Sequence, residues 1–138
     1  MGQQQLLLLI LTIVVVLVAV MAGLGIYDQQ RKKSEADTVL NRSLMVAQAA
    51  IEWRARDSIY GGGGGGGYTP LQGEGVEALG LSASAVRTEI VIGGSDEEVV
   101  DIIGVSTTDP EIGARVVVRG GYIESSDVKI DSSIVVPE

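Results

Sequence analysis

The sequence predicts an α+β fold: a long N-terminal α-helix whose C-terminal half packs on a four-stranded antiparallel β-sheet. Three observations predict this class. Residues 6–26 carry no charge, apolar residues recur at three- and four-residue steps over 28–58, and from residue 87 onward they recur at every second position. No Pro interrupts residues 1–69, so one helix to about residue 58 is the simplest interpretation. The expected organisation is an apolar helix at 1–27, an amphipathic helix at 28–58, a Gly-rich connecting loop at 59–86 and the sheet at 87–138.

The apolar tract 6–26 holds 16 large apolar side chains, and its one hydroxyl group belongs to Thr12. About 20 helical residues cross a hydrocarbon layer, so the tract is long enough to do so. A secretory signal peptide fits poorly, because no Lys or Arg precedes the tract and the tract is too long. A helix that is apolar on all sides must be buried in lipid or in protein.

The amphipathic stretch is expected to cover the sheet. It carries a narrow stripe of mostly apolar residues at helical spacing, and it is the one segment of suitable length to cover an apolar sheet face. The stripe consists of Ala36, Val39, Leu40, Ser43, Val46, Ala47, Ala50 and Arg54.

Four short strands are expected in "RTEIVI", "EEVVDIIGV", "ARVVVRG" and "DVKIDSSIVV", separated by the turn segments "GGSD", "TTDPEIG" and "GGYIESSD". Alternation in each run places the apolar side chains on one face of the sheet. That face would hold Thr88, Ile90 and Ile92, then Val100 and Ile102, then Val116 and Val118, and finally Val128, Ile130 and Ile134, with Val99, Ile103 and Val105 on the other face.

The heptaglycine at 61–67 admits two interpretations. It is either a flexible connector, which composition favours, or a backbone that lies against a neighbouring surface where no side chain fits. Residues 68–86 are expected to form an ordered loop with one short turn.

Composition excludes several functional classes. The chain has no Cys and no His, which removes disulfides, thiol catalysis and most zinc sites. Residues 28–56 carry six basic and four acidic residues, whereas 57–138 carry four basic and fourteen acidic ones. Nucleic acid would be repelled by the acidic part. No nucleophile paired with a base is found, so we predict no enzyme, no cofactor and no metal site.

The N-terminal half resembles that of type IV pilins and the related pseudopilins. The resemblance is carried by the tract behind a short polar start, by "IYDQQRKKSEADTVLNRSLMVAQAAIE" and by "ALGLSASAVRTEIVIGG". Tyr27 falls where pilins commonly carry Tyr if Met1 is the first mature residue. The layout matches over the entire chain, and the residue detail matches over about residues 5–56.

The resemblance implies a structural subunit of an extracellular filament at the cell surface. It implies identical subunits in a helical homopolymer, the pilus assembly machinery and a prepilin peptidase as partners, and methylation as an N-terminal modification. Before assembly the subunit would reside in the inner or cytoplasmic membrane. The residues expected in assembly are Met1, Gln5, Leu6, Leu9, Ile13, Val16, Val20, Gly23, Gly25 and Tyr27.

Gln5 departs from the pilin pattern, which usually has Glu at the fifth mature position. Glutamine accepts a hydrogen bond but carries no charge, so its attraction to a neighbour's ammonium group is weaker. A second numbering, with cleavage after Gly2, would make Leu7 the fifth residue.

The uneven charge suggests pairs between subunits. Arg31, Lys32 and Lys33 would face Asp96, Glu97 and Glu98 of another copy. An alternative class is a single-span membrane protein with a small binding domain, which is extracytoplasmic if the span is oriented as in a pilin precursor. The same basic residues favour this class over a pilin, because basic residues after a span usually mark the cytoplasmic side, whereas a pilin precursor needs that side outside.

Overall fold

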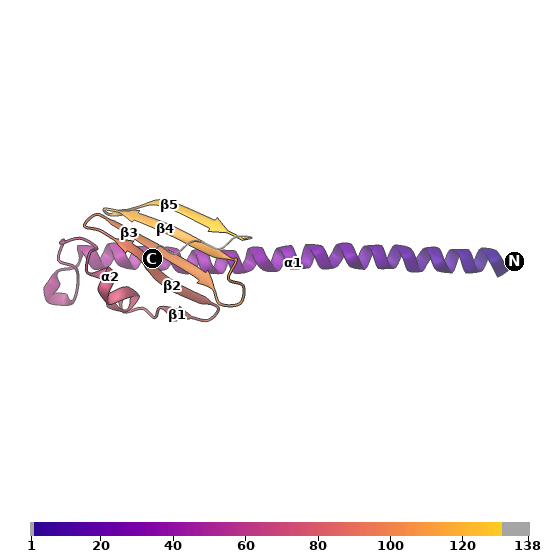
Figure 1. Ribbon diagram of the computed structural model, residues 1–138, viewed down its shortest axis with the longest axis horizontal. Coiled ribbons are helices and arrows are strands. Elements are labelled where there is room, and N and C mark those ends of the chain that lie inside the picture. Colours follow the sequence, from indigo (N-terminus) through magenta and orange to yellow (C-terminus); the bar gives the residue numbers. More distant parts are fainter. Residues whose placement is uncertain (1, 131–138) are drawn as a thin grey trace. The chain divides into compact units, whose positions relative to one another are not determined.

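The computed structural model describes residues 2–130. The predictions made for Met1 and Ile134 lie outside the described residues. The chain divides into two compact units, Met1–Lys33 and Ser34–Glu138, which are described separately. Helix α1 (Gly2–Ala55) supplies the first unit and the opening segment of the second (Figure 1). The continuous helix predicted from the sequence is therefore confirmed, with its end at Ala55.

The second unit contains an antiparallel sheet in the order β1-β2-β3-β4-β5 (Figure 1). The α+β class is confirmed, but the prediction of four strands is wrong because a short fifth strand precedes them. That strand has two residues, too few for any period to be visible in the sequence. The strands are β1 (Ser84–Ala85), β2 (Thr88–Ser95), β3 (Val99–Ser106), β4 (Gly113–Arg119) and β5 (Tyr122–Lys129).

The last strand begins and ends earlier than predicted, at Tyr122 and Lys129. Val128 is therefore exposed, not on a buried face, and Ile130 lies beyond the strand. "GGYIESSD" was expected to be a turn, but only its two glycines connect β4 to β5, with Arg119 paired to Tyr122. Gly120 adopts a φ of 61°, which a two-residue hairpin favours and which glycine adopts without strain. Because all but one of the β5 residues are exposed, the strand lacks the alternation by which the other strands were found.

The core forms where α1 crosses one face of the sheet. The predicted helix stripe is confirmed except at its end, where Trp53 is buried instead of Arg54. Trp53 therefore takes the buried position that was predicted for Arg54, because a large apolar ring is more often buried than a guanidinium group. The core comprises Val46, Ala47, Ala50, Trp53, Tyr68, Leu71, Val76, Ile90, Val100, Ile102, Val116 and Val118.

The opposite face of the sheet also has buried residues near its centre. Ile103 is fully buried there, between its cross-strand neighbours Val91 and Arg115. Beside it the Arg115 Nε–H donates to the Asp101 carboxylate at 2.9 Å. This bond and the negative charge of Asp101 raise the pKa of Arg115.

Helix α1 and strand β3 lie close together at Gly104. A Cβ atom built on Gly104 would overlap the Ser43 hydroxyl and lie 3.1 Å from Val39 Cγ1. Ser43 is itself fully buried, with its Oγ donating to the Val39 carbonyl at 2.9 Å. The glycine is therefore what allows the helix to lie this close to the sheet.

We expect Gly104→Ala to destabilise the second unit by about 1–3 kcal/mol, the usual cost of overpacking a well-packed core. Thermal unfolding followed by fluorescence of Trp53, the one Trp of the chain, measures the loss. Ser43→Gly removes the hydroxyl that the new methyl group would strike. The double variant should therefore lose less than the two single losses added together.

The heptaglycine is folded, in disagreement with a flexible connector. The N–H groups of Gly63, Gly64 and Gly65 donate to the carbonyls of Trp53, Arg56 and Arg54, at 2.8, 2.9 and 3.0 Å. These carbonyls belong to the last turn of α1 and the residue after it, where carbonyls lack partners within the helix. The tract therefore caps the C-terminus of α1.

Side chains are excluded at several positions of the same tract. A Cβ on Gly63 would lie 2.7 Å from the Trp53 ring, and one on Gly67 would lie 2.5 Å from the Glu97 carbonyl oxygen. Gly64, Gly65 and Gly67 also have positive φ angles, which side-chain-bearing residues rarely adopt. The second interpretation of the heptaglycine, a backbone lying against a surface, matches these contacts.

The segment after the glycines holds more helical structure than the single turn expected. The 3₁₀-helix η1 (Ser58–Tyr60) precedes the glycines, and α2 (Leu71–Glu74) and η2 (Gly75–Leu79) follow them. Leu71 and Val76 from these two later helices are buried in the core, which anchors the segment to the sheet.

Candidate assembly surface

The candidate functional surface is the part of α1 within the first unit. The apolar tract from Leu6 to Ile26 forms one regular helix, as its long run of Leu, Ile and Val without Pro allows. Its 16 large apolar side chains are all exposed, from 49% for Val14 to 74% for Met21. Because no side of this segment is covered, the surface is apolar around the full circumference of the helix.

The residues predicted for assembly lie on this segment, except Met1, which is outside the described residues. Most of them follow alternating steps of three and four residues and so share one stripe along the helix. Gln5 borders the stripe, one turn before Leu9, and Gly25 lies off it. The stripe consists of Leu6, Leu9, Ile13, Val16, Val20, Gly23 and Tyr27, and all of these side chains are exposed.

Two features make the segment suited to close helix packing. A Cβ on Gly23 or on Gly25 would meet no atom within 4 Å, so both glycines leave open notches in the surface. Small residues of this kind let neighbouring helices approach closely in an apolar environment. The Thr12 hydroxyl donates to the Leu8 carbonyl at 2.8 Å, so the one hydroxyl of the tract is satisfied within the helix.

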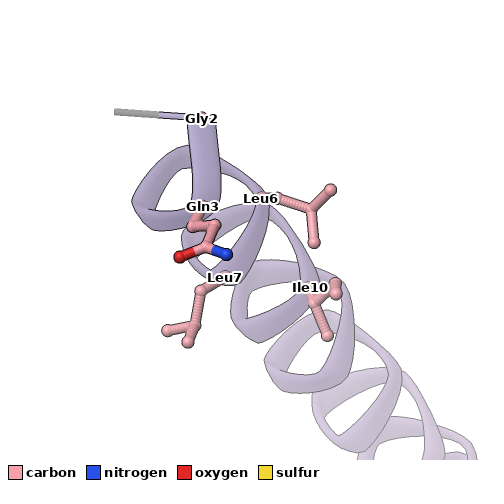
Figure 2. Close-up of a pocket in the computed structure, with 5 residues that line it drawn as sticks. All are labelled: Gly2, Gln3, Leu6, Leu7 and Ile10. Atoms are coloured by element: carbon pink, nitrogen blue, oxygen red, sulfur yellow. The ribbon is translucent and has the colours of Figure 1, made fainter.

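A shallow apolar hollow lies on the first turns of α1, lined by Gly2, Gln3, Leu6, Leu7 and Ile10 (Figure 2). Figure 2 shows that all five residues come from one helix, which forms the hollow between the side chains of successive turns. Such a hollow fits a side chain of an adjoining helix better than a ligand that needs enclosing walls.

The charged residues predicted to pair belong to different units. Arg31, Lys32 and Lys33 end the first unit, and Arg31 and Lys33 are exposed. Asp96, Glu97 and Glu98 form the turn between β2 and β3 of the second unit and expose their side chains. Because the two groups belong to different units, their pairing stays a prediction.

The acidic turn has a fixed backbone. The Asp96 carbonyl accepts a hydrogen bond from the Tyr68 N–H at 3.1 Å, and the Glu98 carbonyl accepts one from the Gly120 N–H at 2.7 Å. The backbone that carries the three carboxylates is thus held in place on the surface of the second unit. Within residues 2–130, no three His, Cys, Asp or Glu side chains gather into a group that could hold a metal ion.

Sequence analysis missed three exposed apolar residues in the second unit. Ile59 and Tyr60, just before the glycines, are 84% and 76% exposed, and Val86, in the turn between β1 and β2, is 87% exposed. Their only signal in the sequence is that large apolar residues stand inside segments that otherwise have the composition of turns and loops.

Comparisons with family models, with curated proteins and with solved structures found no match to this chain. Among the described residues, α1 is the one helix long and apolar enough to cross a membrane, judged by length and composition.

Proposed function

We propose that the chain is a structural subunit of an extracellular filament of the type IV pilus kind, self-assembling through the apolar part of α1. The observation that carries this proposal is the continuity of one helix. Its N-terminal part exposes 16 large apolar side chains, and its C-terminal part lies buried against a folded sheet. The folded second unit is thus joined, without a linker, to a helical segment whose exposed apolar side chains need to be covered.

The energetics favour assembly over exposure to water. At about 1.5–3 kcal/mol for each large apolar side chain, leaving the tract in water costs a few tens of kcal/mol. Lipid and neighbouring copies remove this cost almost equally, so close packing between helices has to favour the filament. The notches at Gly23 and Gly25 support such packing.

We further propose that Arg31, Lys32 and Lys33 pair with Asp96, Glu97 and Glu98 of another subunit. The charge difference between these two exposed regions supports it. Each surface pair contributes only about 0–1 kcal/mol, and salt screens it. Filaments held partly by these pairs should shorten in high salt, as measured by sedimentation.

The proposal implies a membrane-resident precursor, a prepilin peptidase and assembly machinery as partners. The test is to purify the full chain in detergent, remove the detergent without adding lipid, and examine the product by electron microscopy. Long fibres of uniform diameter are the expected result. Soluble monomers or shapeless aggregates after repeated trials with several detergents would contradict the proposal.

A second candidate is a single-span membrane protein with a small binding domain. Arg31, Lys32 and Lys33, directly after the apolar tract, favour it. Reconstitution into lipid vesicles separates the two functions. Monomers that stay in the bilayer at every protein-to-lipid ratio would support this candidate, whereas fibres that leave the vesicles would support the subunit.

A further inference from the structure

The three exposed apolar residues that sequence analysis missed lie on two turns at opposite ends of the second unit. The first turn, residues 57–60, presents Ile59 and Tyr60 and is called the 57–60 tip. The second, residues 86–87, connects β1 to β2, presents Val86 and is called the 86–87 tip. These three are the most exposed large apolar side chains among the described residues of this unit.

The 57–60 tip is held rigidly. The Tyr60 N–H and the Gly62 N–H both donate to the Asp57 carbonyl, at 3.0 and 3.2 Å, and the Gly61 N–H donates to the Ser58 carbonyl at 3.1 Å. Glycines lose more conformational freedom on folding than other residues, so ordering this loop is costly. A rigid turn that presents an aliphatic and an aromatic side chain to solvent is pre-organised for contact.

The 86–87 tip is also held in place, and it is strained. Arg87 has a φ of 66° and is the one residue other than glycine with a positive φ among the described residues. This conformation costs roughly 1–2 kcal/mol for a residue with a side chain. The Arg87 carbonyl accepts a hydrogen bond from the Thr107 N–H at 3.1 Å, which fixes the tip against the loop between β3 and β4.

Hydrogen bonds place the tips at opposite ends of the packed part of α1 (Figure 1). The glycine loop next to the 57–60 tip is bonded to the carbonyls of Trp53 and Arg54, near the end of the helix. The loop that holds the 86–87 tip is bonded to Glu35 through Ser106. Glu35 and Ala55 are separated along the helix axis by about 30 Å at 1.5 Å per residue.

The exposed charges at the two ends are complementary. Arg56 and Asp57 are exposed at the first end, and Arg87 and Glu111 are exposed at the second. A contact between the ends of two copies can set Asp57 against Arg87 and Arg56 against Glu111. Opposite charges around an apolar centre fix the register of an interface more than they add affinity.

From the exposure, rigidity and charge of these turns we infer that the 57–60 tip of one copy docks on the 86–87 tip of a second copy. Because the two surfaces differ, the contact is head-to-tail and leaves one unused tip at each end of a pair, so further copies can add to form a row of subunits. This inference deepens the proposed function and rests on it. The contact would give the filament a second set of interactions outside its apolar core.

The absence of Cys in the native chain allows a direct test. Ser58 is an exposed polar residue within the 57–60 tip, and Thr107 is an exposed residue whose N–H is bonded to the 86–87 tip. In a Ser58→Cys, Thr107→Cys double variant, a disulfide within one copy is excluded because the two positions lie much farther apart than the 4.4–6.8 Å that a disulfide spans between Cα atoms. Full-length chain in detergent is to be oxidised, both before and after detergent removal, and separated without reductant.

The double variant should give a ladder of multimers, whereas each single variant should stay monomeric. Dimers from either single variant would indicate contact between like ends and overturn the inference. A double variant that stays monomeric within intact fibres would also overturn it, while the proposed function would stand. A ladder without fibres would support the contact and count against the filament.

Charge reversal adds a control for specificity. In the double-cysteine background, Asp57→Arg should lower the yield of multimers more than about tenfold, because like charges then meet in the contact. Adding Arg87→Asp should restore the ladder. The charge assignment, and with it the inferred register, would be overturned by one result. That result is an equal yield of multimers from the double-cysteine variant alone, with Asp57→Arg, and with both charge reversals.

Discussion

Replacing Val16 by Arg is expected to abolish fibres while leaving the chain in the membrane. Val16 lies at the midpoint of the apolar tract and is 53% exposed in the isolated unit. In a filament core made of neighbouring helices, a guanidinium at this depth has no water and no partner, and burying it unpaired costs several kcal/mol. Electron microscopy after detergent removal should show no fibres.

Membrane insertion should survive the same substitution. One Arg at the centre of a span costs about 2.5–3.5 kcal/mol on the insertion scale, and a long side chain reaches toward the interface. The remaining large apolar side chains contribute about 0.3–0.6 kcal/mol each, and together they outweigh that cost. Sodium carbonate extraction of membranes measures insertion, and the unchanged fluorescence of Trp53 reports an intact second unit.

The matched control for this prediction is Val16→Leu, which keeps the surface apolar and should still give fibres. If Val16→Arg fibres form as readily as those of the native chain, Val16 does not face neighbours in a dry core. That result would remove the main support for assembly through the tract and would favour the single-span alternative.

Most of the fold could be predicted from the sequence because two periods dominate it. Apolar residues spaced three and four apart identified the helix, and apolar residues spaced two apart identified the strands. The buried residues Ala36, Val46 and Ile102 lie where these two periods placed them. The prediction failed where burial does not alternate. Strand β5 exposes every residue except the half-buried Ile123, and β1 has only two residues, so neither leaves a pattern.

The glycine tract shows why composition misleads at the level of loops. Seven consecutive glycines have the composition of a flexible linker, and nothing in the letters distinguishes a linker from a cap. The conformation is fixed by the carbonyls at the end of α1, which accept hydrogen bonds from the glycines, and by the ring of Trp53, against which a Cβ would clash. Such partners become visible only when the surrounding chain is folded.

The candidate surface was predictable in part. The apolar tract follows from composition, since a helix that is apolar on all sides needs cover around its full circumference. The two tips were not predictable, because each depends on a turn geometry that holds Tyr60 and Val86 outward. Single exposed apolar residues are common on surfaces and give no signal until their positions are known.

Removing the side chain of Tyr68 is expected to have the largest effect on the second unit. Tyr68 is fully buried, its hydroxyl donates to the Gly120 carbonyl, and the Arg54 guanidinium lies 5.1 Å from its ring centroid. Its own N–H is bonded to the β2–β3 turn. One residue thus joins the helix end, the glycine tract and two hairpin turns.

Tyr68→Ala should lower the free energy of unfolding by about 3–5 kcal/mol, as for other large buried rings. For a domain of about 100 residues this lowers the melting temperature by at least ~12 °C. Trp53, which belongs to the same core cluster, reports the transition directly. A loss below about 1 kcal/mol would contradict the central position given to this ring.

Tyr68→Phe separates the hydroxyl from the ring and adds a pH test. At neutral pH it should cost only about 1 kcal/mol, for the hydrogen bond to Gly120. Burial raises the pKa of Tyr68, an effect that the nearby Arg54 opposes. The unfolded chain therefore loses this proton first, near pH 10, and stability falls as the pH rises above that value. The Phe variant lacks this contribution, so its disadvantage relative to the native chain should shrink between neutral pH and pH 11. A constant difference across that range would show that the hydroxyl titrates normally in the folded protein and is open to solvent.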